Sequence, residues 1–372
     1  MRASVAVAAW AVVLCLPRHA AAQAATGLAV IQVAGHPLEV VPGFTVEVYA
    51  EGLSGARFMT LGPDGTVYLS LTREGRVVKL SDANAGGRAD SAITVAQGLE
   101  APHGLAFRGD TLYVAETNRV IRFVPGSARP DVVVADLPHG GGHFTRTIVF
   151  GPSDGKLYVS VGSSCNVCDE RDARRAAVLR YNADGSGEQI FAHGLRNSVG
   201  LAFDPATGEL WGTNNDRDLL GDDLPPDRIN ILHQGGDYGW PRCYLPGHRN
   251  PEYPTADCDH LAPPAITFQA HSAPLGIAFS TGTQFPPEYR GGAFVAYHGS
   301  WNRTVPTGYK VVYVRQQAGL PVAITDFITG FRPAGADAPW ARPVDLLVLR
   351  DGSLLVSDDY SGRIFRVRYT GH

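Results

Sequence analysis

The sequence predicts an all-β protein built as a six-bladed β-propeller. Tyr68, Tyr113 and Tyr158 lie 45 residues apart, and this spacing is the period of a four-stranded propeller blade. Gly and Pro contribute 43 and 26 of the 372 residues, without a collagen period or a low-complexity run. Such a content of turn formers is typical of many short strands joined by tight turns, and it argues against a helical bundle.

Six segments repeat one pattern, in which an apolar strand, a turn and a second apolar strand follow one another. Asp-Gly turns within several of them are typical of antiparallel hairpins. A pair of β-sandwiches is the alternative fold, but it does not account for six copies of one unit. The segments cover residues 58–69, 103–114, 148–159, 200–211, 276–295 and 346–356.

Three further segments lie outside the repeated units: two insertions and one strand-like segment. Insertions around residues 216–227 and 237–271 separate the later units, and we expect the second to be a disulfide-bonded loop. The strand-like segment 44–49 is expected to pair with the last unit and close the ring. Residues 25–372 are therefore predicted to form one propeller domain.

Residues 1–24 have the features of a signal peptide. Arg2 precedes an apolar stretch at residues 5–16, and Ala22-Gln23-Ala24 matches a cleavage site of small residues. The apolar stretch is short for a bilayer span, although an uncleaved anchor is the alternative. We expect cleavage, localisation in the periplasm or outside the cell, and no membrane span in the mature chain.

Export makes the four cysteines outside residues 1–24 informative. An oxidising compartment favours two disulfides between sequence neighbours, Cys165–Cys168 and Cys243–Cys258. A redox pair or half of a zinc site is the alternative for the C-x-x-C motif. Zinc is the weaker alternative because no second C-x-x-C motif or His pair lies nearby.

Basic side chains recur in the loops that precede the repeated units. In a propeller such loops open onto the central channel, so residues at related positions converge there. Arginine pairs bidentately with carboxylates and phosphates, and we therefore expect a ring of cations around an anionic ligand. Unrelated solvent-facing loops are the alternative. The residues concerned are Arg57, His103, His143, Arg196, Asn197 and Arg342.

Several ordered motifs are more specific than the repeat. They are His143 eight residues before Gly151-Pro152, HGLRN at 193–197, RIN at 228–230 followed by GDYGWP at 236–241, YHGSWNR at 297–303 and RPVD at 342–345. With these motifs, residues 40–370 resemble the soluble glucose/sorbosone dehydrogenases, six-bladed propellers that use pyrroloquinoline quinone (PQQ) and calcium to oxidise sugars. The last two motifs resemble the sorbosone dehydrogenase-like branch.

The resemblance implies a role for each matching residue. His143 matches the catalytic base, which takes the hydroxyl proton as hydride leaves the sugar carbon. Arg196 matches a catalytic arginine beside the quinone carbonyls, where a fixed cation stabilises negative charge on the reduced cofactor. Asn197 matches its hydrogen-bonding neighbour. Arg342 matches a residue that clamps a cofactor carboxylate.

The resemblance also implies a calcium site. In the family, calcium is held by the cofactor and by main-chain carbonyls, which here are those of Asp216 and Arg217. Hard oxygen ligands suit calcium, and Asp218, Asp222 and Asp223 add negative charge nearby. A solvated acidic loop is the alternative for this segment.

The orienting group of the base departs from the family pattern. Ser163 stands where the glucose-oxidising members carry an acidic residue. A base without a carboxylate partner is expected to be weaker, unless Asp169 or Glu170 folds back toward it.

Three cofactor positions depart as well. Val344 replaces an arginine of the clamp, and Val199 replaces a glutamine that contacts the cofactor. Arg303 or His298 is the candidate substitute for the family's lysine. These changes argue against assuming glucose as the substrate.

Together these features predict an exported quinoprotein dehydrogenase that transfers hydride to PQQ from an aldose sugar or a sugar-derived aldehyde. No C-x-x-C-H heme motif is present, so an external electron acceptor, a soluble carrier or a quinone, is expected. A net charge of −4 without a Lys/Arg run gives no indication of nucleic-acid binding. The alternatives are a calcium-dependent lactonase and a non-catalytic propeller that binds carbohydrate or protein.

Overall fold

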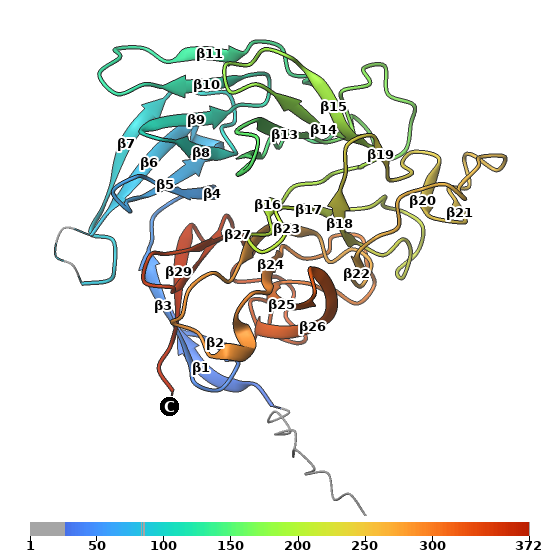
Figure 1. The fold of residues 1–372 in the computed structure, drawn as a ribbon. Coiled ribbons are helices and arrows are strands. Elements are labelled where there is room, and N and C mark those ends of the chain that lie inside the picture. The colour runs from blue at the N-terminus through green and yellow to red at the C-terminus, as the bar shows by residue number, and fades with distance from the viewer. Residues whose placement is uncertain (1–26, 83, 85, 372) are drawn as a thin grey trace, which may run out of the picture.

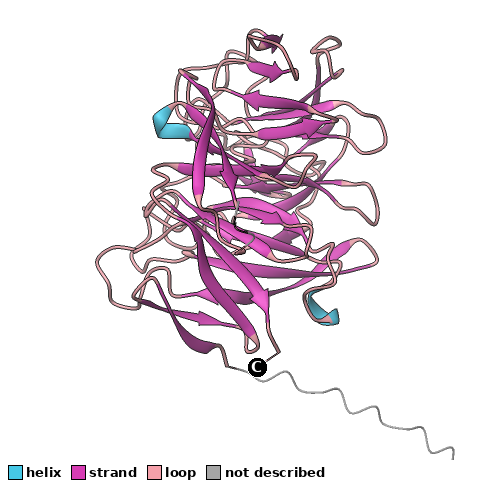
Figure 2. Ribbon diagram, turned by 90° about the vertical axis from the view of Figure 1, so that its left-hand side faces the viewer, coloured by secondary structure: helices cyan, strands magenta, loops and turns pink. Residues whose placement is uncertain are grey.

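The computed structural model describes residues 27–82, 84 and 86–371. Within them six sheets of four or more strands are arranged around a central axis, which confirms the predicted six-bladed propeller (Figure 1). Two short 3-10 helices, Thr72–Glu74 and Pro287–Tyr289, are the exceptions to strand and loop in these residues (Figure 2). The predicted signal peptide, residues 1–24, lies outside the described residues.

The first three blades follow the chain in order. Blade 1 consists of β4 (Ala56–Leu61), β5 (Val67–Leu71), β6 (Arg76–Ser81) and β7 (Ser91–Gln97). Blade 2 consists of β8 (Leu105–Arg108), β9 (Thr111–Ala115), β10 (Val120–Phe123) and β11 (Asp131–Val134). Blade 3 consists of β12 (Ile148–Phe150), β13 (Leu157–Val161), β14 (Ala177–Tyr181) and β15 (Gln189–His193), with β19 (Gly236–Asp237) added in parallel.

The last three blades recruit distant segments. Blade 4 consists of β16 (Leu201–Phe203), β17 (Leu210–Asn214), β18 (Arg228–Leu232) and β22 (Ile266–Thr267). Blade 5 consists of β23 (Pro274–Phe279), β24 (Ala293–Tyr297), β25 (Lys310–Gln317) and β26 (Leu320–Thr329), extended by β2 (His36–Val40) and β1 (Ala29–Val33). Blade 6 consists of β27 (Pro343–Val348), β28 (Leu354–Asp358), β29 (Arg363–Tyr369) and β3 (Phe44–Ala50).

The ring closes through β3, as the sequence predicts. This N-terminal strand pairs antiparallel with the C-terminal strand β29, from Phe44 opposite Tyr369 to Ala50 opposite Ile364. Phe44 is buried and makes edge-on contacts with Phe285, Phe327 and Tyr369, at centroid distances of 4.9, 4.8 and 5.1 Å. The closing strand is therefore held by ladder hydrogen bonds and by a shared aromatic core.

Residues before β3 form a hairpin that the sequence did not predict. β1 and β2 pair with each other, and β2 continues blade 5 through Glu39 opposite Thr329 and Val40 opposite Ile328. Leu38 is fully buried in the core between blades 5 and 6. The hairpin covers the edge of β26, which would otherwise present unpaired backbone groups.

Both predicted disulfides are present. Cys165 is bonded to Cys168 in the loop after β13, and Cys243 is bonded to Cys258 in the insertion between β18 and β22. That insertion contains a small hairpin of β20 (Cys243–Leu245) and β21 (His248–Arg249). In the described part of the chain, no helix is long and apolar enough to cross a membrane.

The innermost strands of the six blades surround the axis, and a small apolar cluster lies between them. β4, β8, β12, β16, β23 and β27 contact one another in turn around the ring. Phe58, Val199, Leu275 and Val344 form one buried cluster there. Val199 and Val344 are the two residues that replace polar cofactor contacts of the family. In this structure both belong to the apolar cluster that forms the floor of the channel.

Candidate functional site

Two adjoining cavities lie at the channel mouth. We call the first, of about 680 Å³, the axial cavity, because its wall includes Val199 and Leu275 of the apolar floor. We call the second, of about 150 Å³, the lateral cavity; its wall includes Arg196, Asp216, Asp218 and Asp227. Both share seven lining residues, which are His143, Asn197, Asn215, Ala273, His298, Trp301 and Arg342. Most of the predicted site residues therefore meet at one place.

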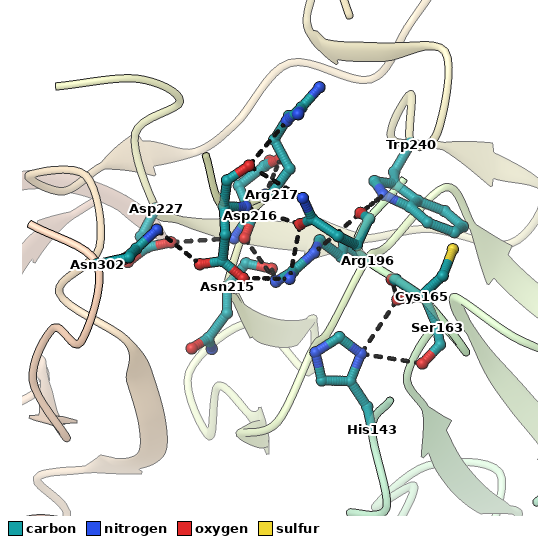
Figure 3. Close-up of polar contacts among 12 residues, drawn as sticks. His143, Ser163, Cys165, Arg196, Asn215, Asp216, Arg217, Asp227, Trp240 and Asn302 are labelled. Carbon is teal, nitrogen blue, oxygen red and sulfur yellow. Dashed lines mark hydrogen bonds and ion pairs between the residues drawn. The ribbon is translucent and has the colours of Figure 1, made fainter. Parts of the chain in front are cut away.

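His143 is held by the loop that follows β13. Its Nδ1 lies 3.0 Å from the carbonyl oxygen of Ser163 and 3.1 Å from Ser163 Oγ (Figure 3). Ser163 Oγ donates its own hydrogen to the carbonyl of Cys165, at 2.6 Å. Both Ser163 atoms are thus acceptors toward the ring, so Nδ1 carries the proton and Nε2 carries the free lone pair.

The electrostatic surroundings keep this imidazole neutral. Burial, with the nearby Arg196 guanidinium as the largest charge effect, lowers the pKa of His143 to about 3. An exposed imidazole titrates near neutral pH, whereas the ring of His143 is largely removed from solvent and lies near the guanidinium groups of Arg196, Arg146 and Arg175. Neither acidic neighbour compensates, since Asp169 pairs with Arg242 at 2.8 Å and Glu170 binds Ser164 Oγ at 2.7 Å.

Arg196 is fixed on four sides at the wall of the lateral cavity. Its Nη2 donates to Asp218 Oδ2 at 2.7 Å and to Asn166 Oδ1 at 3.0 Å. Its Nη1 donates to the carbonyl of Asp216 at 2.6 Å, and its Nε to the carbonyl of Asn166 at 3.2 Å (Figure 3). The next residue, Asn197, lines both cavities, and its side-chain amide has no hydrogen-bond partner among the described residues.

A second imidazole lines both cavities and has a carboxylate partner. His298 Nε2 lies 2.9 Å from Asp359 Oδ1, and Asp359 Oδ2 accepts a hydrogen bond from Arg57 at 2.8 Å. Burial lowers the pKa of His298 to about 4, even though Asp359 opposes this change. Burial alone would raise the pKa of Asp359, but His298 and Arg57 together hold it below its usual range. Asp359 was missed from the sequence because its partners come from other blades.

Arg342 is the half-buried guanidinium of the wall. Its Nε and Nη2 donate to the carbonyls of His298 and Gly299, at 3.0 and 2.8 Å. No carboxylate within the described residues pairs with it, in contrast to Arg57 and Arg196. Its positive charge is therefore available to an anionic ligand.

Three predicted residues lie away from the cavities. His103 is fully buried beside Phe58, with Nδ1 3.3 Å from the carbonyl of Arg146, so it packs below the site and is not part of the ring of cations. Arg303 lines neither cavity and pairs with Asp223 at 2.9 Å. Arg217 also lies outside both walls, and its guanidinium pairs with Glu252 at 2.6 Å.

The lateral cavity is rich in oxygen atoms that suit a hard cation. Asp227, which the sequence analysis did not single out, is buried and accepts hydrogen bonds from the backbone N–H groups of Asp216 and Ala273, at 3.0 and 2.9 Å. Burial raises the pKa of Asp227 to about 7, and the nearby Asp216 adds to this effect. The carbonyl of Asp216, a predicted calcium ligand, accepts from Arg196 in this structure.

Sequence and structure comparisons place the chain among known proteins. An uncharacterized protein of Borreliella burgdorferi is 30% identical over 355 residues, covering 89% of this chain and 91% of that protein. A pyrroloquinoline quinone-dependent pyranose dehydrogenase of Coprinopsis cinerea is 25% identical over 414 residues, covering 90% of this chain and 55% of that protein. This chain therefore spans about half the length of the Coprinopsis relative.

Two solved structures share the fold. The holo form of the pyranose dehydrogenase PQQ domain from Coprinopsis cinerea has a TM-score of 0.77 at 24% identity, covering 90% of this chain and 97% of that chain. The calcium structure of a Trichoderma reesei protein of carbohydrate-active enzyme family AA12 has a TM-score of 0.78 at 24% identity, covering 91% and 98%. These relatives confirm the resemblance to PQQ-dependent sugar dehydrogenases. A family described as TrAA12-like matches residues 38–370, and the chain belongs to this TrAA12-like family.

Proposed function

We propose that the protein is a PQQ- and calcium-dependent dehydrogenase that oxidises an aldose sugar or a sugar-derived aldehyde. The observation that carries the proposal is the neutral imidazole of His143, whose Nε2 lone pair is free while Nδ1 is held by Ser163. The same cavity walls present Arg196, Asn197 and Arg342. A base and fixed cations around one cavity are what hydride removal from an alcohol carbon requires.

The residues of the site fit PQQ, an anion with three carboxylates. Arg342 lacks a carboxylate partner among the described residues, and a cofactor carboxylate would complete its ion pair. The unpaired amide of Asn197 supplies both a donor and an acceptor to the same space. When bound, PQQ would supply the two-electron acceptor for hydride. His298 lines both cavities and is a further candidate contact, whereas Arg303 would have to leave Asp223 to take part.

The chain's own residues would handle the proton. His143 Nε2 would accept the hydroxyl proton of the substrate, while Nδ1 keeps donating to the carbonyl of Ser163. Arg196 is the largest charge that lowers the pKa of His143. Negative charge brought beside Arg196 would therefore raise that pKa and make His143 a stronger base. Cofactor binding and base strength are coupled through Arg196 in this proposal.

Calcium would use the oxygen atoms of the lateral cavity. The carboxylates of Asp216, Asp218 and Asp227 line it, and hard oxygen donors suit Ca²⁺. The carbonyl of Asp216 would have to exchange its hydrogen bond with Arg196 for the cation. The carbonyl of Arg217 belongs to the same loop, although Arg217 lines neither cavity.

Export and an external electron acceptor complete the proposal. Two disulfides favour an oxidising compartment such as the periplasm or the cell exterior. The described chain carries no heme motif, so electrons would leave to a soluble carrier or a quinone.

The test is a binding and turnover assay on the purified protein. PQQ binding is followed by fluorescence quenching with and without Ca²⁺, and turnover by dye reduction over a panel of aldoses and aldehydes. We expect micromolar or tighter PQQ binding, Ca²⁺-dependent dye reduction, and a H143A variant that binds PQQ without turnover. Absence of PQQ binding would overturn the proposal, and lactone hydrolysis with Ca²⁺ alone would support the lactonase instead.

A further inference from the structure

The loop at residues 163–168 connects both halves of the site. It leaves β13, and the disulfide between Cys165 and Cys168 closes it over three residues of sequence separation. At its start, the carbonyl of Ser163 accepts hydrogen bonds from both the backbone N–H and Nδ1 of His143, at 3.1 and 3.0 Å. The next carbonyl, of Ser164, accepts from the backbone N–H of Gly142 at 2.7 Å. The His143 loop therefore rests directly on the disulfide loop.

Asn166, inside the disulfide ring, binds the other half. Its main-chain carbonyl accepts from Arg196 Nε at 3.2 Å and from Trp240 Nε1 at 3.0 Å. Its side-chain Oδ1 accepts from Arg196 Nη2 at 3.0 Å and from the backbone N–H of Asp218 at 2.8 Å. Its Nδ2 donates to the carbonyl of Asp218 at 3.0 Å. One half-buried side chain and its carbonyl thus tie together blade 3, the Asp218 loop and the insertion that carries Trp240.

These contacts fix the plane of the Arg196 guanidinium. Two of its nitrogens bond to Asn166, and the remaining contacts are to Asp218 and to the carbonyls of Asp216 and Asn215. Asp218 is itself held by Asn166, at both its N–H and its carbonyl. Loss of the Asn166 side chain therefore removes one hydrogen bond of Arg196 directly, and it also removes both bonds that hold the backbone of Asp218, whose carboxylate pairs with Arg196.

We propose that Asn166 is the positioning residue of Arg196, and that the Cys165–Cys168 disulfide holds Asn166 in the required place. This inference rests on the proposed function, in which Arg196 faces the cofactor. Asn166 lines neither cavity, so it acts through Arg196 and not by touching substrate or cofactor. A short covalent ring limits the backbone conformations of the residues within it, which suits a residue that must present its carbonyl and amide together.

The first arm of the test uses the apo-protein. In arginine-labelled protein, the Nη–H resonances of Arg196, assigned by their loss in R196K, report exchange with water, because Nη2 donates to the side chain of Asn166 whereas Nε donates to a main-chain carbonyl that N166A keeps. We expect exchange at least about tenfold faster in N166A and in the C165S/C168S double variant. N166D keeps an acceptor for Nη2 but loses the amide that donates to the carbonyl of Asp218, so its exchange rate should lie between those of the wild type and N166A. N182A is the matched control, because Asn182 is also half-buried in blade 3 and bonds Ser186 and Lys156, at 2.8 and 2.6 Å, away from both cavities.

The second arm uses the protein loaded with PQQ and Ca²⁺. Misplacement of a catalytic group by about 1 Å costs about 100-fold in rate, so we expect N166A to lower kcat about 10- to 100-fold with the sugar KM changed less than about twofold. A merely structural role would instead lower thermal stability and active fraction equally at unchanged kcat. Wild-type exchange and kcat in N166A would overturn the inference. If the wild type binds no PQQ, the proposed function fails, and the apo-protein arm still decides whether Asn166 positions Arg196.

Discussion

Replacing Ser163 by aspartate tests how the base is oriented. In the native chain the partners of His143 Nδ1 are the carbonyl of Ser163 at 3.0 Å and the hydroxyl at 3.1 Å. S163D places a carboxylate beside the protonated nitrogen and leaves the main-chain carbonyl available. S163A removes the same hydroxyl without adding charge, and is therefore the matched control.

The magnitude follows from the existing pKa of the ring. Burial and Arg196 lower the pKa of His143 to about 3. An opposite charge within about 4–6 Å favours the charged form by about 1 to 3 in pKa, so the pKa of His143 in S163D should lie between about 4 and 6. The ring remains neutral at pH 7 and becomes a stronger base. With half of the proton transferred in the transition state, a rise of about 2 in pKa raises kcat about tenfold.

At acidic pH the effect of S163D on the rate is reversed. A protonated imidazole cannot accept the substrate proton, so the acid limb of the kcat/KM profile should move upward in pH for S163D. S163D should therefore be faster than the wild type near pH 7 and slower below about pH 4, because the two profiles cross midway between the two pKa values when half of the proton is transferred. S163A should keep the native pH profile, with kcat lowered at most about tenfold, because one neutral hydrogen bond contributes about 0.5–1.5 kcal/mol.

The assay combines a dye-reduction pH profile with a histidine NMR titration of the apo-protein. An unchanged acid limb in S163D, together with an unchanged His143 resonance, would refute the assignment of Nδ1 as the nitrogen held by Ser163. Equal profiles for S163D and S163A would show that residue 163 does not face the ring.

Three other changes have expected outcomes. H143Q removes the base and should lower kcat by about 10²- to 10⁴-fold with PQQ binding retained, as measured by dye reduction and fluorescence quenching. R342Q removes a guanidinium of both cavity walls that has no carboxylate partner within the described chain, and it should weaken PQQ binding about 10- to 100-fold, since charge-assisted hydrogen bonds contribute about 1.5–3 kcal/mol; unchanged affinity would remove it from the cofactor site. F44A opens the aromatic core that holds the closing strand β3 and should lower the free energy of unfolding by about 3–5 kcal/mol in denaturant titration, whereas a loss below 1 kcal/mol would mean that the ladder alone closes the ring.

The ring of blades could be predicted because its signals are local. Each blade repeats its strands and turns along the chain, and the closing strand at 44–49 carries an ordinary strand pattern. The β1–β2 hairpin could not be predicted in the same way. Its place beside β26 depends on only two residue pairs between segments about 290 positions apart, and such pairing leaves no periodic signal.

The residues of the site also divide into those that the repeats predict and those that they do not. Position within the repeats predicted that Arg57, His143, Arg196 and Arg342 converge, and all four line the two cavities. His103 occupies a comparable position but turns inward, because Phe58 and the carbonyl of Arg146 offer it a buried place.

The site residues that could not be predicted from the sequence are mainly carboxylates. Asp359 holds both His298 and Arg57, across 61 and 302 residues of sequence. Asp227 is distinguished by its burial, which the sequence does not show. Such residues become partners because different blades pack side by side. Residue type and spacing along one blade therefore do not reveal them.

Ser163 shows that the effect of a replaced family residue can be judged only when the backbone geometry is known. The side-chain carboxylate expected at this position is absent, yet the nitrogen that it would hold is held by the main-chain carbonyl of the same residue. A main-chain acceptor depends on the shape of the loop and not on the identity of residue 163. That shape is maintained by the Cys165–Cys168 disulfide and by the contacts of Asn166 with Arg196 and Asp218. The orientation of His143 and the position of Arg196 therefore depend on one loop, and replacements in that loop should change both together.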